Sequence, residues 1–250
     1  MFESSFRSFR PFAIPVLLAV ALAGCSSADG SSQKGPPSAM SKANPSRGAG
    51  ATTAEAAPGS SAALPDSLTE AADRGRVLGA DTAPVWLLMV SDFQCPWCKK
   101  WHDETYPAIK RDYVDAGKVK VAYLNYPMAM HLNARPAAIA AMCASAQGKF
   151  WQTHDRIFQM QGTWEKQADP RPYLDSLAVA SGADAARQRA CSAGGKLNAL
   201  IDADFARAHQ AQVTGTPVFF VGGRRIDGAE PIGVFRMVID SVLRAGTRNK

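Results

Sequence analysis

The spacing of apolar residues predicts alternating strands and helices in the middle of the chain. Residues 83–90 form a short continuous apolar run, which is typical of a fully buried strand. Residues 99–116 carry bulky apolar side chains at helical intervals before Gly117, a stop signal, so we expect one helix there. Residues 118–124 alternate with a period of two and predict a second strand.

The second half of the chain begins with a long segment that has no strand pattern. Residues 132–212 are rich in alanine and are interrupted by Gly and Pro, which predicts four or five consecutive helices. Residues 217–221 then predict a strand, 222–223 a tight hairpin turn and 224–226 the return strand. Residues 231–243 are expected to form the last helix.

The first 24 residues have the pattern of a signal peptide. Arg7 and Arg10 precede an apolar run, residues 11–23, that is too short to cross a bilayer as a permanent helix. The run ends in Leu-Ala-Gly followed by Cys25, which resembles the bacterial lipobox. We therefore expect a signal peptide over 1–24 and a lipidated Cys25 that anchors the mature protein to a membrane of the cell envelope. An ordinary signal peptide with a chance cysteine is the alternative.

Composition divides the rest of the chain into a tether and one domain. Residues 25–67 are almost wholly Ala, Ser, Gly, Pro, Thr and scattered charges, and they cannot bury enough apolar surface to offset the entropy of ordering. Residues 68–250 are enough for a single folded domain. The formal net charge is only +6, and basic residues do not cluster with aromatic ones, so we expect no nucleic-acid partner.

Cys95 and Cys98 form a Cys-x-x-Cys motif between the first predicted strand and the following helix. At a helix start, this spacing puts both sulfurs on one face within disulfide reach. The Cys95 thiolate would lie at the positive end of the helix dipole, which lowers its pKa. Pro96 suits the first helical turn, and Trp97 offers an apolar face to an incoming peptide. The alternative readings are a structural bridge or half of a zinc site, but a second ligand pair is missing, so we expect no metal.

The remaining cysteines, Cys143 and Cys191, are expected to form a structural disulfide. If Cys25 is lipidated and Cys95 pairs with Cys98, these two are the only thiols left. An even number of cysteines in an oxidising compartment favours this pairing. Two separate buried thiols are the alternative.

Three segments resemble the DsbA-like branch of the thioredoxin superfamily, and the likeness extends over residues 77–243. They are SDFQCPWC at 91–98, QGKFW at 147–151 and VTGTPVFFVGG at 213–223. The resemblance implies an α/β, thioredoxin-like fold, a central mixed sheet flanked by helices, with an all-helical insertion at about 132–212. It also implies a cis-proline loop at Thr216-Pro217 that faces the redox pair and binds substrate. A trans proline that begins a strand is the other reading of Pro217.

The sequence departs from this family at one position. The family has a buried acid six residues before the first cysteine, where it relays protons, and Met89 occupies that position here. Asp92 is a candidate for the proton relay or, with equal weight, for a cap of the active-site helix. His131, His154 and His209 stand apart from one another, so we expect packing or hydrogen-bonding roles rather than metal ligation.

The predicted function is that of a protein disulfide oxidoreductase without a cofactor. Its expected partners are exported proteins with cysteines and a membrane redox partner that recycles the Cys95–Cys98 pair, and the protein is expected to be a monomer. The oxidase direction is favoured because the helical insertion is present and no dimerisation domain precedes the core. The alternatives are a reductase or isomerase, or a non-catalytic module that holds Cu(I) on the two thiols or unfolded peptide on Trp97.

Overall fold

The computed structural model describes residues 67–248, with side chains as far as Gly246. The expected signal peptide, Cys25 and nearly all of the expected tether lie outside the described residues. In chain order the elements are α1 (Ser67–Gly75), β1 (Val77–Leu78), β2 (Val85–Ser91), α2 (Pro96–Glu104), α3 (Tyr106–Ile109), a π-helical turn (Lys110–Val114), β3 (Val119–Asn125), α4 (Ala134–Ser145), α5 (Phe150–Gln159), α6 (Gln161–Trp164), α7 (Arg171–Ala180), α8 (Ala185–Gly194), α9 (Asn198–Gln210), β4 (Val218–Val221), β5 (Arg224–Asp227) and α10 (Ile232–Arg248).

Five strands form one mixed sheet in the order β1-β3-β2-β4-β5. β2 and β3 are parallel, and the helical crossover through α2 and α3 makes this possible, whereas the other neighbours are antiparallel. Gly222 and Gly223 close the β4–β5 hairpin with φ values of 53° and 84°, which glycine adopts without strain. The expected α/β class with a mixed sheet flanked by helices is confirmed.

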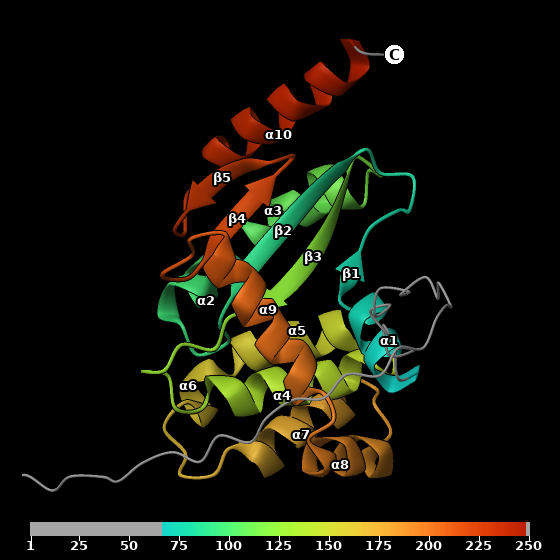
Figure 1. The fold of residues 1–250 in the computed structure, drawn as a ribbon, viewed down its shortest axis with the longest axis vertical. Coiled ribbons are helices and arrows are strands. Elements are labelled where there is room, and N and C mark those ends of the chain that lie inside the picture. Colours follow the sequence, from blue (N-terminus) through green and yellow to red (C-terminus); the bar gives the residue numbers. More distant parts are fainter. Residues whose placement is uncertain (1–66, 249–250) are drawn as a thin grey trace, which may run out of the picture. The chain divides into compact units, whose positions relative to one another are not determined.

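Helices cover the sheet in separate groups (Figure 1). α4, α5, α6, α7 and α8 lie together at one end of the sheet, and α10 lies at the other. On one face of the sheet, Phe219 of β4 packs against Trp101 of α2 and Phe235 of α10, with ring centroids 4.5 and 4.9 Å away. The buried helix–sheet interface holds the start of α2 rigidly at the end of β2.

Several elements differ from the sequence prediction. The single helix expected over 99–116 is divided into α2, α3 and the π-helical turn, because Pro107 has no N–H to donate to the preceding turn. Six helices rather than four or five occupy residues 134–210. β2 is not fully buried, since Trp86 is 42% exposed on the face opposite Leu87.

Candidate active site

The Cys95–Cys98 pair lies where β2 passes into α2. Cys95 is the N-cap residue of α2 and has extended backbone angles, and Pro96 occupies the first helical turn. Both cysteines are free thiols, and they are 3% and 1% exposed, respectively. Backbone N–H groups at the start of α2 have no intrahelical partner, so they can donate to a sulfur at the N-cap.

The loop before β4 lies directly against Cys95. The Thr216–Pro217 peptide bond is cis. The Cys95 sulfur lies 3.3 Å from the Thr216 carbonyl oxygen, to which it can donate only in its protonated form. The Thr216 hydroxyl lies 3.6 Å from the sulfur of Met128, which belongs to the loop after β3. The structure thus brings Thr216 and Pro217 to the redox pair, although more than 100 residues separate them in the sequence.

The two thiols differ strongly in ionisation. The Cys98 thiol donates a hydrogen bond to the Cys95 sulfur, and this contact does most to lower the pKa of Cys95 to about 6, against the effect of burial. Thr216 and the backbone N–H groups of Cys98 and Trp97 contribute to the same shift. Burial raises the pKa of Cys98 well above its ordinary value, and the neighbouring Cys95 raises it further. At neutral pH, Cys95 is therefore a thiolate and Cys98 a protonated thiol.

Ser91 is a polar contact of Cys98 that the sequence analysis missed. Its hydroxyl and the backbone N–H of Asp92 both hydrogen-bond to Cys98 and partly counteract the effect of burial on that thiol. Ser91 is 2% exposed and ends β2, while Met89, at the position of the family's buried acid, is 1% exposed. The position of Ser91, a polar residue at the end of an otherwise apolar strand, was the sequence signal that could have indicated this contact.

Asp92 joins the active-site turn to the loop after β3. Its carboxylate accepts hydrogen bonds from the backbone N–H groups of Gln94 (2.7 Å) and Met128 (2.9 Å), and it lies 2.7 Å from Nδ1 of His131. Burial raises the pKa of Asp92, and these contacts offset only part of that effect. Cys95, not Asp92, is the N-cap residue of α2.

Side-chain amides tie the active-site turn to the helical segment that follows β3. Gln161 of α6 donates to the carbonyl oxygens of Phe93 (2.7 Å) and Cys95 (3.3 Å). Gln94 accepts a hydrogen bond from the backbone N–H of Asn133 and donates to the carbonyl oxygen of Glu165. Isolated glutamines give no recognisable sequence signal, so these positioning contacts were not predicted.

Apolar side chains are exposed on the α2 helix and on the loop between β3 and α4. Trp97, two residues after Cys95 in the sequence, is 59% exposed, and Lys100 lies over its ring. Met130 and Leu132 in the loop are 74% and 84% exposed. Large exposed apolar side chains near a reactive thiol suit contact with a polypeptide chain.

Comparison with known proteins agrees with this geometry. The family model described as Thioredoxin matches residues 71–241. This chain belongs to the thioredoxin family. Both the strand that leads to the redox pair and the cis-proline segment lie within the matched residues.

Relatives of this thioredoxin-family chain include proteins of disulfide bond formation. The probable disulfide bond formation protein D of Bacillus anthracis is 36% identical over 85 residues, 34% of this chain and 39% of that protein. The Na(+)/H(+) antiporter NhaA 1 of Salinispora arenicola is 33% identical over 177 residues, 70% of this chain and 26% of that protein. The chain thus spans about two fifths and about a quarter of these relatives.

Solved structures share the fold of this thioredoxin-family chain. The crystal structure of Wolbachia pipientis alpha-DsbA1 aligns with a TM-score of 0.63 at 22% identity, covering 70% of this chain and 94% of that one. The expected thioredoxin-like fold is confirmed, and its solved neighbours include a DsbA protein.

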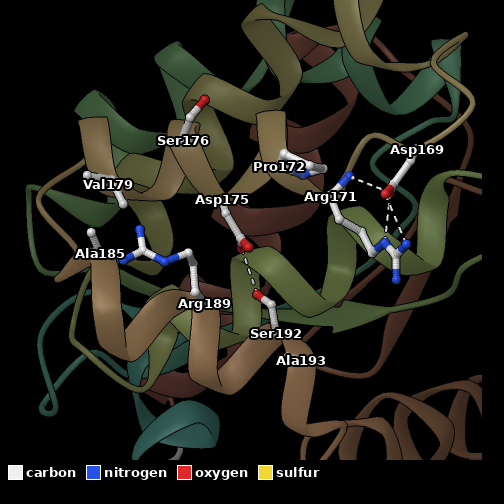
Figure 2. Close-up of a pocket in the computed structure, with 10 residues that line it drawn as sticks. All are labelled: Asp169, Arg171, Pro172, Asp175, Ser176, Val179, Ala185, Arg189, Ser192 and Ala193. Carbon is white, nitrogen blue, oxygen red and sulfur yellow. Dashed lines mark hydrogen bonds and ion pairs between the residues drawn. The ribbon is translucent and has the colours of Figure 1, made fainter.

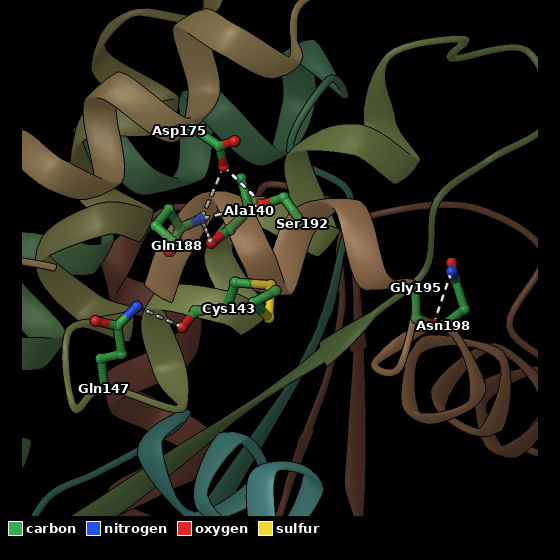
Figure 3. Close-up of a disulfide and its surroundings, with 9 residues drawn as sticks. Ala140, Cys143, Gln147, Asp175, Gln188, Ser192, Gly195 and Asn198 are labelled. Carbon is green, nitrogen blue, oxygen red and sulfur yellow. Dashed lines mark hydrogen bonds between the residues drawn. A yellow bond between two sulfur atoms is a disulfide. The ribbon is translucent and has the colours of Figure 1, made fainter. Parts of the chain in front are cut away.

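The helical segment of the thioredoxin-family domain contains the second cysteine pair (Figure 3). Cys143 of α4 and Cys191 of α8 form a disulfide, with Cα atoms 5.7 Å apart. Close by, Gln188 donates to the carbonyl oxygen of Ala140 and to the carboxylate of Asp175. The disulfide and the bond to Ala140 hold α8 to α4, and the bond to Asp175 links α8 to α7.

A cavity of about 540 Å³ lies between α7 and α8, apart from the redox pair (Figure 2). Arg171 pairs with Asp169 at its rim, and Ser192 donates to Asp175 within it. Its lining contains no cysteine. Over residues 67–248, none of the helices combines the length and apolar character that crossing a bilayer requires.

Proposed function

We propose that this chain is a protein disulfide oxidoreductase that acts on exported proteins through Cys95 and Cys98. The observation that carries the proposal is the opposite ionisation of the two thiols, with a pKa of about 6 for Cys95 and a raised pKa for Cys98. A low-pKa sulfur is a good leaving group, and it also reacts as a thiolate at neutral pH. Cys95 is accordingly the sulfur that exchanges with substrate.

The oxidising reaction begins with the Cys95–Cys98 disulfide. A substrate thiolate attacks the sulfur of Cys95, a mixed disulfide forms, and Cys98 leaves and takes up a proton. Asp92, whose carboxyl has a pKa raised by burial, is our candidate proton source for this step. A second substrate thiolate then attacks the substrate sulfur and releases the Cys95 thiolate. The substrate loses two electrons, and the redox pair gains them.

The proposed net direction is oxidation of the substrate. Stabilisation of the Cys95 thiolate favours the reduced pair, and a stabilised reduced form makes the corresponding disulfide a stronger oxidant. A membrane redox partner would accept the two electrons and restore the disulfide. Thr216 and Pro217 would line the surface for the substrate chain, since the Thr216 carbonyl oxygen already lies 3.3 Å from the Cys95 sulfur.

Trapping of mixed disulfides tests the exchange reaction. The Cys98→Ala variant lacks the resolving thiol, so we expect it to accumulate mixed disulfides with exported proteins. The matched Cys95→Ala variant should form none. Redox equilibration of the wild-type pair with glutathione tests the direction, and a potential as low as that of thioredoxin, about −270 mV, would argue for a reductase. Equal trapping by both variants would contradict the assignment of Cys95 as the exchanging sulfur.

We also propose that Cys25 is lipidated and anchors the domain on the periplasmic or extracytoplasmic side of a cell-envelope membrane, through the segment that precedes the described residues. The support is the Leu-Ala-Gly-Cys pattern after an apolar run. The Cys25→Ser change should abolish incorporation of a labelled fatty acid and leave the protein in the soluble fraction or unprocessed. An unlabelled wild-type protein would contradict the proposal.

A further inference from the structure

Three metal-binding side chains converge behind the redox helix, in the contact between α2 and α5. His102 is one helical turn beyond Cys98 on α2, and His154 and Asp155 are adjacent on α5. Nε2 of His102 lies 3.1 Å from Oδ1 of Asp155, and Nδ1 of His154 lies 2.8 Å from the same oxygen. A ligand atom from each residue lies within 4.8 Å of the other two.

We propose that His102, His154 and Asp155 bind a zinc ion at this position. Two imidazoles and one carboxylate are a ligand set that Zn²⁺ accepts, and the fourth tetrahedral position is left for water. Bonds of about 2.1 Å in a tetrahedral site put neighbouring ligand atoms roughly 3.4 Å apart. To admit the ion, the separations of 2.8 and 3.1 Å need to widen by about 0.6 and 0.3 Å, and the ligand atoms of the two imidazoles lie within 4.8 Å of each other.

A neighbouring carboxylate prepares His102 for ligation. Oδ1 of Asp103 lies 2.8 Å from Nδ1 of His102. A carboxylate on the second ring nitrogen is the usual outer partner of a metal-bound histidine, because it leaves the other nitrogen's lone pair facing the ion. His154 would ligate through Nδ1, which lies 2.8 Å from Oδ1 of Asp155, and its Nε2 atom has no hydrogen-bond partner among the described residues.

Asp155 is the most exposed of the three proposed ligands. His154 is fully buried and the His102 side chain is 9% exposed, whereas the Asp155 side chain is 39% exposed and connects the cluster to solvent. The ring of Phe158 lies 5.0 Å from both imidazoles and shields the other side. This apolar wall would strengthen the interaction between the ion and the Asp155 carboxylate, because it lowers the local dielectric.

His102 lies 53 residues before Asp155 in the sequence, which explains why spacing did not suggest this site. The sequence predicts a packing or hydrogen-bonding role for His154, and His154 does lie within hydrogen-bond distance of Asp155. The nitrogen and oxygen atoms of these hydrogen bonds are the ones that would bind zinc. The proposal does not depend on the redox function, because neither Cys95 nor Cys98 is a ligand. Bound zinc would link the redox helix α2 to α5.

Zinc titration of the full chain tests the proposal. The protein carries Cys25→Ser and is fully oxidised, so that no free thiolate can bind the metal, and a chromophoric chelator competes for zinc. We expect one ion per chain. His102→Gln and Asp155→Asn should each weaken the affinity about tenfold or more, as loss of a ligand or its support typically does. His209→Gln, at an exposed histidine of α9, should leave the affinity unchanged.

Cobalt provides a second readout that reports the ligand type. Co²⁺ in the oxidised protein should give the visible bands of a tetrahedral nitrogen and oxygen site without a thiolate charge-transfer band, and His102→Gln should abolish them. Absence of zinc binding by the oxidised protein would overturn the proposal. Wild-type affinity in both His102→Gln and Asp155→Asn would also overturn it.

Discussion

The hydrogen bond from Cys98 to Cys95 is the largest contribution to the low pKa of the Cys95 thiol. Cys98→Ala removes this donor and should therefore shift the midpoint of Cys95 alkylation from about 6 towards the ordinary value of 9.0. Cys98→Ser keeps a hydroxyl donor at the same place and should shift the midpoint less. The rate of iodoacetamide reaction against pH measures both. Equal midpoints in the wild type and Cys98→Ala would show that the helix start and Thr216 determine the pKa instead.

At the scale of elements, one buried ion pair joins α9 to the sheet and to the end of α1. Arg76 pairs with Asp204 of α9 and donates to the carbonyl oxygen of Tyr123 in β3. Asp204 is fully buried and also accepts from the backbone and side-chain N–H groups of Asn125. These contacts link segments that are otherwise separate in the sequence.

Asp204→Ala should destabilise the fold severely. It leaves the Arg76 guanidinium buried without its main partner, which costs about 3–5 kcal/mol in the free energy of unfolding. Asp202→Ala is the matched control, since Asp202 pairs with Arg135 on the exposed side of the same helix and such pairs contribute about 1 kcal/mol or less. Denaturant unfolding of both variants measures the difference. Equal losses would mean that the Arg76–Asp204 pair adds little.

The Cys143–Cys191 disulfide joins α4 to α8, and its two cysteines are 48 residues apart in the sequence. Replacing both cysteines with alanine should lower the free energy of unfolding by roughly 4 kcal/mol, because the unfolded chain regains the entropy of an open loop. The Cys95 alkylation midpoint should not change, since this bond lies in the helical segment. Denaturant unfolding checks the first expectation and alkylation the second. A stability equal to that of the wild type would contradict the structural role.

At the scale of the whole molecule, the reduced form should gain stability as the pH rises. Folding lowers the pKa of Cys95, so ionisation of this thiol adds to the free energy of unfolding. This stabilisation is complete only above the ordinary pKa of 9.0 and is lost as the pH falls through about 6. Cys98 has a raised pKa, and its contribution declines only above this range. Between about pH 5 and about pH 8 we expect the free energy of unfolding of the reduced form to rise by on the order of 2 kcal/mol relative to that of the oxidised form.

Unfolding of both redox forms at the two pH values measures this gain. The oxidised form is the reference, because its Cys95 and Cys98 do not titrate. The Cys95→Ala variant in its reduced state should lose the gain. A gain that persists in this variant would assign the pH dependence to another group.

The amino-acid sequence by itself determined the local elements and the redox pair. The apolar run at 83–90, the alternation at 118–124 and the hairpin glycines each depend on neighbouring residues, and they correspond to β2, β3 and the β4–β5 turn. The position of Cys95 at the start of a helix is equally local. Short-range periodicity and turn chemistry suffice for such features because they act within a few residues.

Only the tertiary structure decided which distant groups surround the thiols. Ser91 against Cys98, Gln161 against the Cys95 carbonyl and the pairing of Asp92 with His131 all require the sheet and the helical segment to be packed together. The hydrogen-bond partners of a buried polar group come from whichever elements pack against it, and a pKa follows from those partners and from burial. The spacing of residues along the sequence specifies neither the hydrogen-bond partners nor the burial of a thiol. The pKa values of Cys95 and Cys98 therefore follow only from the folded chain.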